Sequence, residues 1–147
     1  MKLEGKYTYK ASQQVVWDLY NNIEALQKAL PGCEKLEERE PNKYDALLKI
    51  GIAAVKGTYN GKFEVADHEP PRRYRLSGEG SGTPGFVKGD GIIEFSQDGE
   101  STTVSYKGEV QVGGLIAGVG QRLIGGIAKM MIKEFFRKMK KELKSLQ

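Results

Sequence analysis

The feature that most constrains this chain is the run 57–112, in which apolar and polar side chains alternate and glycines recur on the apolar side. Residues two apart in a β-strand point to the same face of a sheet, so Gly61 shares a face with Tyr59 and Phe63. The glycines predicted on apolar faces are Gly61, Gly78, Gly80, Gly89, Gly91 and Gly108. Because protein interiors are packed to crystal-like density, the missing side chains predict a bent sheet or a hollow concave face.

The rest of the chain predicts the elements that surround these strands. Residues 2–10 alternate apolar and polar side chains and predict a first strand. Ser12 is placed to cap a first short helix, and a second short helix is predicted over residues 22–29. Six antiparallel strands are expected next, followed by a helix of roughly 30 residues that begins at Leu115.

This order of elements predicts one α+β domain over residues 1–147, in which a curved antiparallel sheet wraps around the long C-terminal helix. An apolar stripe is predicted along that helix beside a basic one. The apolar stripe comprises Val119, Leu123, Ile127, Met131, Phe135, Met139 and Leu143. The basic stripe comprises Lys129, Lys133, Arg137, Lys141 and Lys144. Such a helix buries its apolar side against the sheet and leaves its basic side in solvent.

Composition argues for a soluble protein without an obvious catalytic centre. The chain has 147 residues and a formal net charge of +4, with one cysteine, Cys33, and one histidine, His68. One residue of each kind gives neither an intramolecular disulfide nor a metal cluster of recognised spacing. The first residues lack the apolar core of a signal peptide, and no stretch reaches the ~18 apolar residues of a membrane span. We therefore expect a cytoplasmic location.

Two binding functions are disfavoured by the same sequence. The glycine-rich segment 85–91 lies within a strand pattern and lacks the Gly-Lys-Ser/Thr ending of a phosphate-binding loop. Arg73 and Arg75 alternate onto the solvent face, and the basic helix has no second basic surface with exposed aromatic residues beside it. We therefore expect neither nucleotide nor nucleic-acid binding.

Four segments of the chain carry a family resemblance. They are Leu-Pro-Gly-Cys-Glu at 30–34, Gly-Phe-Val-Lys-Gly-Asp-Gly at 85–91, Gly-Glu-Val-Gln-Val-Gly-Gly-Leu-Ile-Ala at 108–117 and Val-Gly-Gln-Arg-Leu-Ile at 119–124. Together they resemble the carbon monoxide dehydrogenase G-subunit family, within the SRPBCC (START-like, helix-grip) superfamily. The similarity spans essentially the whole chain. It implies a helix-grip fold, which binds apolar ligands between its sheet and its C-terminal helix.

The resemblance also implies a function. The chain is expected to be a non-catalytic accessory protein of an aerobic molybdenum-containing CO dehydrogenase or a related hydroxylase. Its implied roles are to help recruit that enzyme to the membrane and to bind an apolar ligand. A respiratory quinone or another lipid is the natural ligand, and no covalently bound cofactor is expected. Peripheral contact with the anionic inner face of the cell membrane follows. Many family members continue into an apolar C-terminal anchor, so a chain that stops at Gln147 is expected to be a short or trimmed form.

The residues expected to contact the ligand lie on the inward faces of the strands and along the start of the long helix. They are Phe63, Tyr74, Phe86, Tyr106, Val110, Leu115, Val119, Gln121, Arg122, Leu123 and Ile127. Gln121 and Arg122 either hydrogen-bond a quinone carbonyl or a lipid head group, or only cap the junction of helix and sheet. The cavity mouth is expected near residues 82–86 and 113–120. The basic stripe is expected to dock on anionic lipid or on the dehydrogenase.

Two alternatives stay open at this point. Related helix-grip proteins include cyclase/aromatase-like enzymes acting on hydrophobic substrates, and such an enzyme would need a polar pair inside the cavity, for which Tyr106 and Arg122 are the candidates. The other alternative is a ligand-free structural adaptor with a filled core, in which the glycines serve only the curvature of the sheet.

Overall fold

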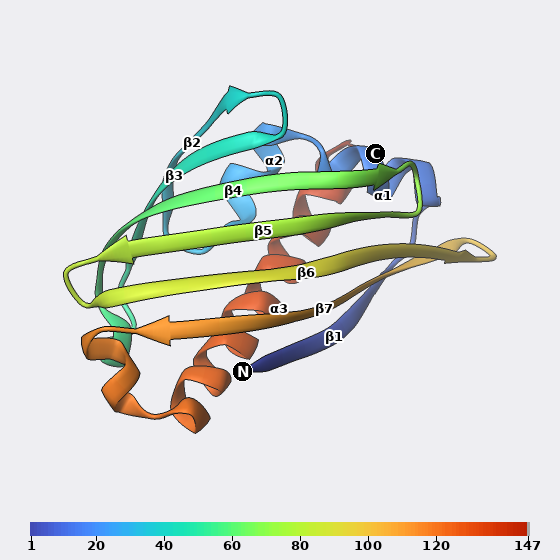
Figure 1. The fold of residues 1–147 in the computed structure, drawn as a ribbon. Helices are drawn as coiled ribbons and strands as arrows, with labels where there is room; N and C mark the ends of the chain where they lie inside the picture. Colours follow the sequence, from blue (N-terminus) through green and yellow to red (C-terminus); the bar gives the residue numbers. More distant parts are fainter. Residues whose placement is uncertain (147) are drawn as a thin grey trace.

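The computed structural model describes residues 1–146 and contains one antiparallel sheet with helices packed on one of its faces (Figure 1). The strands are β1 (Lys2–Tyr9), β2 (Cys33–Glu40), β3 (Lys43–Ile50), β4 (Gly57–Glu69), β5 (Arg73–Gly82), β6 (Gly85–Asp98) and β7 (Ser101–Gly113). The helices are α1 (Gln13–Tyr20), α2 (Ile23–Ala29) and α3 (Gln121–Leu146), with two short 3-10 helices, η1 (Ala53–Val55) and η2 (Leu115–Val119). The predicted α+β arrangement, with two short helices after the first strand, is confirmed.

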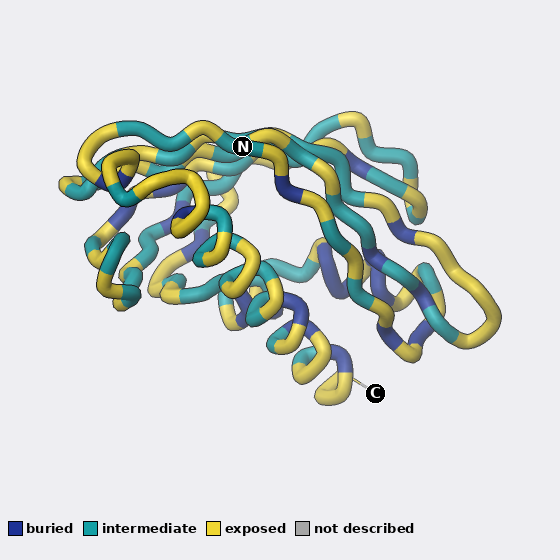
Figure 2. Tube along the Cα trace, turned by 90° about the horizontal axis from the view of Figure 1, so that it is seen from below, coloured by how far each residue is buried: buried dark blue, intermediate teal, exposed yellow. Residues whose placement is uncertain are grey.

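The strand order explains how the sheet can hold a helix. Its seven strands lie in the order β1-β7-β6-β5-β4-β3-β2, and neighbours are antiparallel. After β1 the chain passes through α1 and α2 to the opposite edge of the sheet and then returns strand by strand until β7 lies beside β1. The sheet is curved, and α3 lies across its concave face (Figures 1 and 2). The predicted helix-grip geometry is therefore present.

Side-chain caps begin both short helices. The Ser12 hydroxyl accepts a hydrogen bond from the Val15 N–H at 3.3 Å, and Asn22 Oδ1 accepts one from the Ala25 N–H at 3.0 Å. These bonds satisfy amide groups that the first turn of a helix leaves unpaired. The caps therefore set where each short helix begins.

The packed core is concentrated at one end of the concave face. Trp17 and Tyr20 of α1 pack against Phe95 of β6, with ring centroids 5.1 Å and 5.3 Å apart. The C-terminal half of α3 adds Phe136 and Met139 to the same cluster. Three of the four buried residues of α3 lie in this half, at Phe136, Met139 and Leu143. The N-terminal half of α3 is therefore the part of the helix with space beneath it.

The start of the long helix differs from the prediction, which placed it at Leu115. Residues 115–119 form the separate helix η2, and α3 begins only at Gln121. Gly120 between them has φ +94°, which is outside the right-handed helical region. The turn at Gly120 therefore separates the two helices.

The predicted apolar stripe is wrong at its start for a geometric reason. A step of four residues turns about 40° beyond a full helical turn, so a stripe built on such steps rotates around the helix. Leu123 is 49% exposed, whereas its neighbour Ile124 is buried, and Val119 lies in η2 rather than in α3.

Within the described residues no helix combines the length and the apolar character needed to cross a membrane.

Candidate functional site: an apolar cavity

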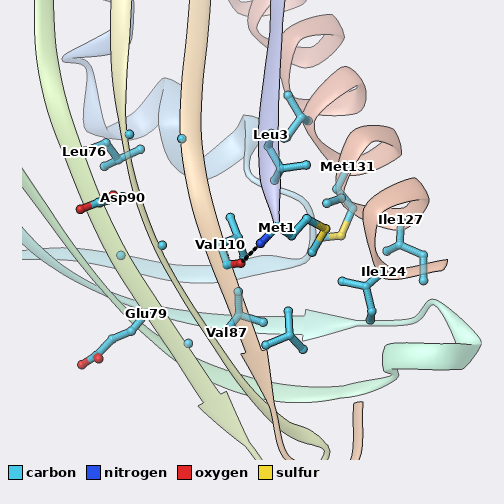
Figure 3. Close-up of a pocket in the computed structure, with 18 of the residues that line it drawn as sticks. Met1, Leu3, Leu76, Glu79, Val87, Asp90, Val110, Ile124, Ile127 and Met131 are labelled. Carbon is cyan, nitrogen blue, oxygen red and sulfur yellow. Dashed lines mark hydrogen bonds between the residues drawn. The ribbon is translucent and has the colours of Figure 1, made fainter. Parts of the chain in front are cut away.

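A cavity of about 470 Å³ lies between the concave face of the sheet and the N-terminal half of α3 (Figure 3). The strands supply most of its wall, and α3 supplies the opposite side. The apolar lining residues are Met1, Leu3, Leu48, Ile50, Val55, Tyr59, Phe63, Leu76, Val87, Ile93, Tyr106, Val110, Val112, Ile116, Ile124, Ile127, Ala128, Met131 and Ile132. This volume falls within the ~300–1,000 Å³ of typical small-molecule sites.

The glycines of the concave face contribute to this cavity in two different ways, and Gly80 shows the first. A Cβ atom built on Gly80 would have only the Asn60 carbonyl oxygen within reach, at 3.9 Å. At Gly78, by contrast, the ring of Phe63 takes the place of a side chain, because a Cβ there would lie 2.8 Å from Phe63 Cδ1. Gly80 therefore contributes empty volume, and Gly78 makes room for an aromatic ring.

Gly91 and Gly108 show the second role, which is curvature. They are direct partners on β6 and β7. A Cβ on Gly108 would lie 2.5 Å from the Asp90 carbonyl oxygen, and one on Gly91 would lie 2.7 Å from the Lys107 carbonyl oxygen. Real Cβ atoms do not approach backbone atoms so closely, so only glycine allows these strands to bend together. Space and curvature, the two predicted roles of the glycines, thus both occur, each at different positions.

Tyr106 supplies the polar group inside this apolar space. Its ring lies over Gly5 of β1 and packs near Phe136, with ring centroids 5.8 Å apart. A tyrosine hydroxyl is protonated at neutral pH, and burial raises the pKa of Tyr106 further above its usual value. No hydrogen bond engages this hydroxyl within residues 1–146, whereas the Tyr59 hydroxyl donates to the Val55 carbonyl at 2.6 Å. Tyr106 can therefore donate a hydrogen bond to a ligand.

The two carboxylates among the lining residues point away from the cavity. Figure 3 shows the carboxylates of Glu79 and Asp90 directed to the opposite side of the sheet. Met1 closes the side nearest β1, because its amino group donates to the Val110 carbonyl at 2.9 Å and its sulfur lies against Gly125 of α3. A cationic ligand would therefore find no carboxylate inside, and an apolar one would meet matching walls.

The predicted contact residues fall into three groups. Phe63, Tyr106, Val110 and Ile127 line the cavity. Tyr74 lies in the packed core, where its ring meets Trp17 and Phe95 at centroid distances of 5.7 Å and 5.9 Å. The others do not line the cavity and lie at or near the surface around η2, namely Phe86, Leu115, Val119, Gln121, Arg122 and Leu123. A role in ligand binding stays a prediction for all of these residues.

The sequence prediction missed the wall formed by β3 and η1. Leu48, Ile50 and Val55 line the cavity from that side. Leu48 and Ile50 alternate in the sequence as inward-facing residues do, so the signal was present. No glycine interrupts their face between 44 and 50, and a prediction based on glycine-bearing faces therefore did not include them.

The basic stripe lies where it was predicted, on the solvent side of α3. Lys129, Lys133, Lys141 and Lys144 are exposed, and so is Arg137. Arg137 Nε donates to Glu134 Oε2 at 3.0 Å, and this bond lowers the pKa of the Glu134 carboxyl. The docking role of the stripe stays a prediction.

The comparisons with known proteins agree with this geometry. A family model described as the carbon monoxide dehydrogenase G-subunit, CoxG, matches residues 5–144. The chain belongs to this family. No curated protein sequence matches this CoxG-family chain. The predicted family resemblance is therefore confirmed.

Solved structures place this CoxG-family chain among START-like folds. A conserved protein from Geobacillus kaustophilus is 40% identical with a TM-score of 0.96, covering 99% of this chain and 96% of that one. A START superfamily protein from Mycobacterium smegmatis is 12% identical with a TM-score of 0.79, covering 99% of both chains. The Zhui aromatase/cyclase from Streptomyces sp. R1128 is 12% identical with a TM-score of 0.72, covering 98% of this chain and 93% of that one. The last two likenesses establish the fold alone.

The other residues considered for chemistry, His68 and Cys33, make packing and backbone contacts in the structure. No group of three His, Cys, Asp or Glu side chains is arranged to hold a metal ion in residues 1–146. His68 packs against the rings of Trp17 and Tyr74, with centroids 6.3 Å and 6.0 Å away. The Cys33 thiol donates to the Lys35 carbonyl at 3.4 Å, and burial raises its pKa. A raised pKa keeps a thiol protonated and unreactive.

Proposed function

We propose that this protein carries an apolar molecule in the cavity beneath α3 and thereby serves a molybdenum-containing CO dehydrogenase or related hydroxylase at the membrane. The observation that carries the proposal is the cavity itself, about 470 Å³ in volume with apolar walls. A filled core would give a structural adaptor no such space. Membership of the CoxG family supports the link to that class of enzyme.

The chemistry of the cavity favours a ligand with a large apolar body and at least one hydrogen-bond acceptor. Apolar walls stabilise a ligand roughly in proportion to the area that leaves water. The unengaged Tyr106 hydroxyl would otherwise lack a partner in a dry cavity, and a carbonyl oxygen would provide one. A respiratory quinone has both properties, and it would also accept the electrons that such an enzyme releases.

The proposal is tested by loading the protein from a membrane. The purified protein is incubated with vesicles that contain a ubiquinone or a menaquinone, separated by flotation, and extracted into organic solvent for mass spectrometry. We expect a near-stoichiometric amount of quinone in the protein fraction. An extract no richer than that of an unrelated protein of similar size would contradict the carrier function.

Replacing Tyr106 by phenylalanine is expected to weaken the binding of a quinone about threefold to tenfold. The net value of one such hydrogen bond is about 0.5–1.5 kcal/mol, or a factor of about 2–12 in Kd, which contains that range. The phenylalanine ring keeps the contact with Gly5 and with Phe136, so the wall itself is preserved. Affinity is measured by titration with a short-chain quinone.

The matched control for Tyr106→Phe is a hydrocarbon of the same shape without carbonyl groups. Its affinity is expected to be the same for both proteins, because it makes no hydrogen bond to the hydroxyl. An equal loss for the quinone and the hydrocarbon would show that Tyr106 acts through packing alone.

We also propose that the protein has no catalytic step of its own. The Zhui neighbour is an aromatase/cyclase, but its 12% identity supports the fold and carries no residue roles. Of the candidate polar pair, Tyr106 lines the cavity while Arg122 is exposed at the start of α3 and does not. A half-buried tyrosine with a raised pKa, without that partner, is a poor proton donor or acceptor at neutral pH.

A further inference from the structure

Three loops at one end of the molecule carry no charged side chain. Residues 50–55, 82–87 and 112–121 contain no Asp, Glu, Lys, Arg or His, although 29% of the whole chain is Asp, Glu, Lys or Arg. They comprise η1, the turn between β5 and β6, and η2 with its flanking glycines. We call these three segments the apolar tip.

The three segments of the apolar tip are contiguous in space. The Ile116 N–H donates to the Pro84 carbonyl at 2.8 Å, which joins η2 to the β5–β6 turn. Pro84 also packs over Gly57, just after η1, and η1 contacts η2. In Figure 1 η2 lies at the end of the molecule opposite to α1. The apolar tip is therefore one surface made by segments far apart in the sequence.

Large apolar side chains of the apolar tip and the adjoining first turn of α3 are exposed. Leu115 in η2 is 78% exposed, and Phe86 and Leu123 are each 49% exposed. Gathered apolar groups of this size on a protein surface usually mark an interaction site. Ala117 and Gly118 of η2, with the flanking Gly114 and Gly120, are also exposed and add backbone without charge. Something other than water is expected to cover this surface.

The charges that directly follow the three segments of the apolar tip are basic, although Lys88 lies opposite Glu79 on the paired strand β5. Lys56 follows η1, Lys88 follows the β5–β6 turn, and Arg122 follows Gln121 at the start of α3. All three are exposed, and in the part of the chain that the structure describes no ion pair joins any of them to a carboxylate. An apolar surface with a basic border matches the interface of an anionic bilayer, where acyl chains lie beneath negative head groups.

The apolar tip is also part of the cavity wall. Ile50, Val55, Val112 and Ile116 belong to its segments and line the cavity. A bilayer in contact with the outer side of these segments would therefore be separated from the cavity only by them.

We propose that the apolar tip inserts into the interface of an anionic lipid bilayer and that the ligand passes there between the bilayer and the cavity. The membrane contact stands on the exposed apolar residues and their basic border, while the passage of ligand rests on the proposed carrier function. Insertion at the apolar tip places α3 and its basic stripe at an angle to the membrane rather than flat on it. It thereby assigns the membrane contact to a surface other than the basic stripe.

Insertion is measured with an environment-sensitive fluorophore on a single introduced cysteine. In a Cys33→Ser background, Leu115→Cys reports on the apolar tip and Leu123→Cys on the adjoining first turn of α3, and Val15→Cys, also exposed but on α1, is the matched control. With vesicles of phosphatidylcholine and phosphatidylglycerol, we expect a blue shift and a rise in emission at 115 and 123 and no change at 15. Water-like emission at 115 in vesicle-bound protein, or failure of the wild-type protein to bind these vesicles, overturns the proposal.

Substitutions separate the apolar tip from the basic stripe and from the cavity. Leu115→Asp with Leu123→Asp is expected to reduce vesicle binding at least about tenfold, because it places two carboxylates at the lipid interface. Val15→Asp is the control for added charge. Binding that is lost on reversing Lys133, Arg137 and Lys141 to Glu but unaffected by the tip substitutions would overturn the proposal. Failure of the carrier function alone would appear differently, as vesicle binding at the apolar tip without quinone in the extract.

Discussion

Replacing Gly80 by leucine is expected to weaken the binding of an apolar ligand roughly tenfold to a hundredfold while the protein still folds. Gly80 lines the cavity, and a Cβ at this position meets nothing closer than the Asn60 carbonyl oxygen at 3.9 Å. A leucine side chain would therefore extend into the cavity without straining the sheet. A ligand would have to compete with this side chain for space. Overpacking an apolar site costs about 1–3 kcal/mol, and we expect a loss of that size in the free energy of ligand binding. Quinone titration and extraction after vesicle loading measure the effect.

The matched control introduces the same side chain one position along the strand. Ser81 is exposed and, by alternation, points to the outer face of the sheet, so Ser81→Leu adds leucine without filling the cavity. Both variants are expected to unfold within about 1 kcal/mol of the wild-type protein. Equal ligand binding by the Gly80→Leu and wild-type proteins would mean that the ligand lies elsewhere, and the carrier proposal would lose its central observation.

The concave face could be predicted from sequence because its pattern is local. Alternation within each strand places Phe63, Tyr106 and Val110 on the inward side, and the structure lines the cavity with all three. The interruption of that pattern by glycine predicted space or curvature. Local alternation cannot say which of the two a given glycine serves, because that depends on the strand paired beside it.

The contacts of the helix start were harder to predict because they depend on one backbone angle. Helical spacing continues in the sequence through Leu115, Val119 and Leu123, yet the positive φ of Gly120 separates η2 from α3. Leu115 and Leu123 are both exposed, and their neighbours Ile116 and Ile124 line the cavity instead. Spacing fixes which residues share a face of a continuous helix, but a break resets the phase.

Tyr74 lies outside the cavity because of contacts between residues far apart in the sequence. Alternation correctly places the Tyr74 side chain on the concave face of the sheet. The cavity, however, does not extend along the whole of that face. The aromatic residues of α1 fill the end at which Tyr74 lies, through Trp17 and its contact with Phe95. Which end of the sheet is filled depends on where α1 and α2 pack, and that is a tertiary property.

Replacing Gly108 by alanine is expected to destabilise the protein by about 1–3 kcal/mol, because the sheet has no room for one methyl group at this position. The new Cβ would lie 2.5 Å from the Asp90 carbonyl oxygen on the paired strand β6. Backbone atoms in the middle of a sheet cannot turn aside as a flexible side chain can. The strands must therefore move apart, at a cost in hydrogen bonding and packing comparable to that of an overpacked core. The free energy of unfolding in urea measures the change.

Gly80→Ala is the matched control, since it makes the same chemical change in the neighbouring part of the sheet. Alanine restricts the unfolded chain to the same extent in both variants, and that effect alone would stabilise each by about 0.5–1 kcal/mol. At Gly80 the methyl group enters open space, so the expected change is zero or slightly stabilising. The difference between the two variants therefore isolates the close approach of β6 and β7. If both variants unfold at the same urea concentration, the approach of these strands does not depend on glycine, and the curvature that forms the cavity has another origin.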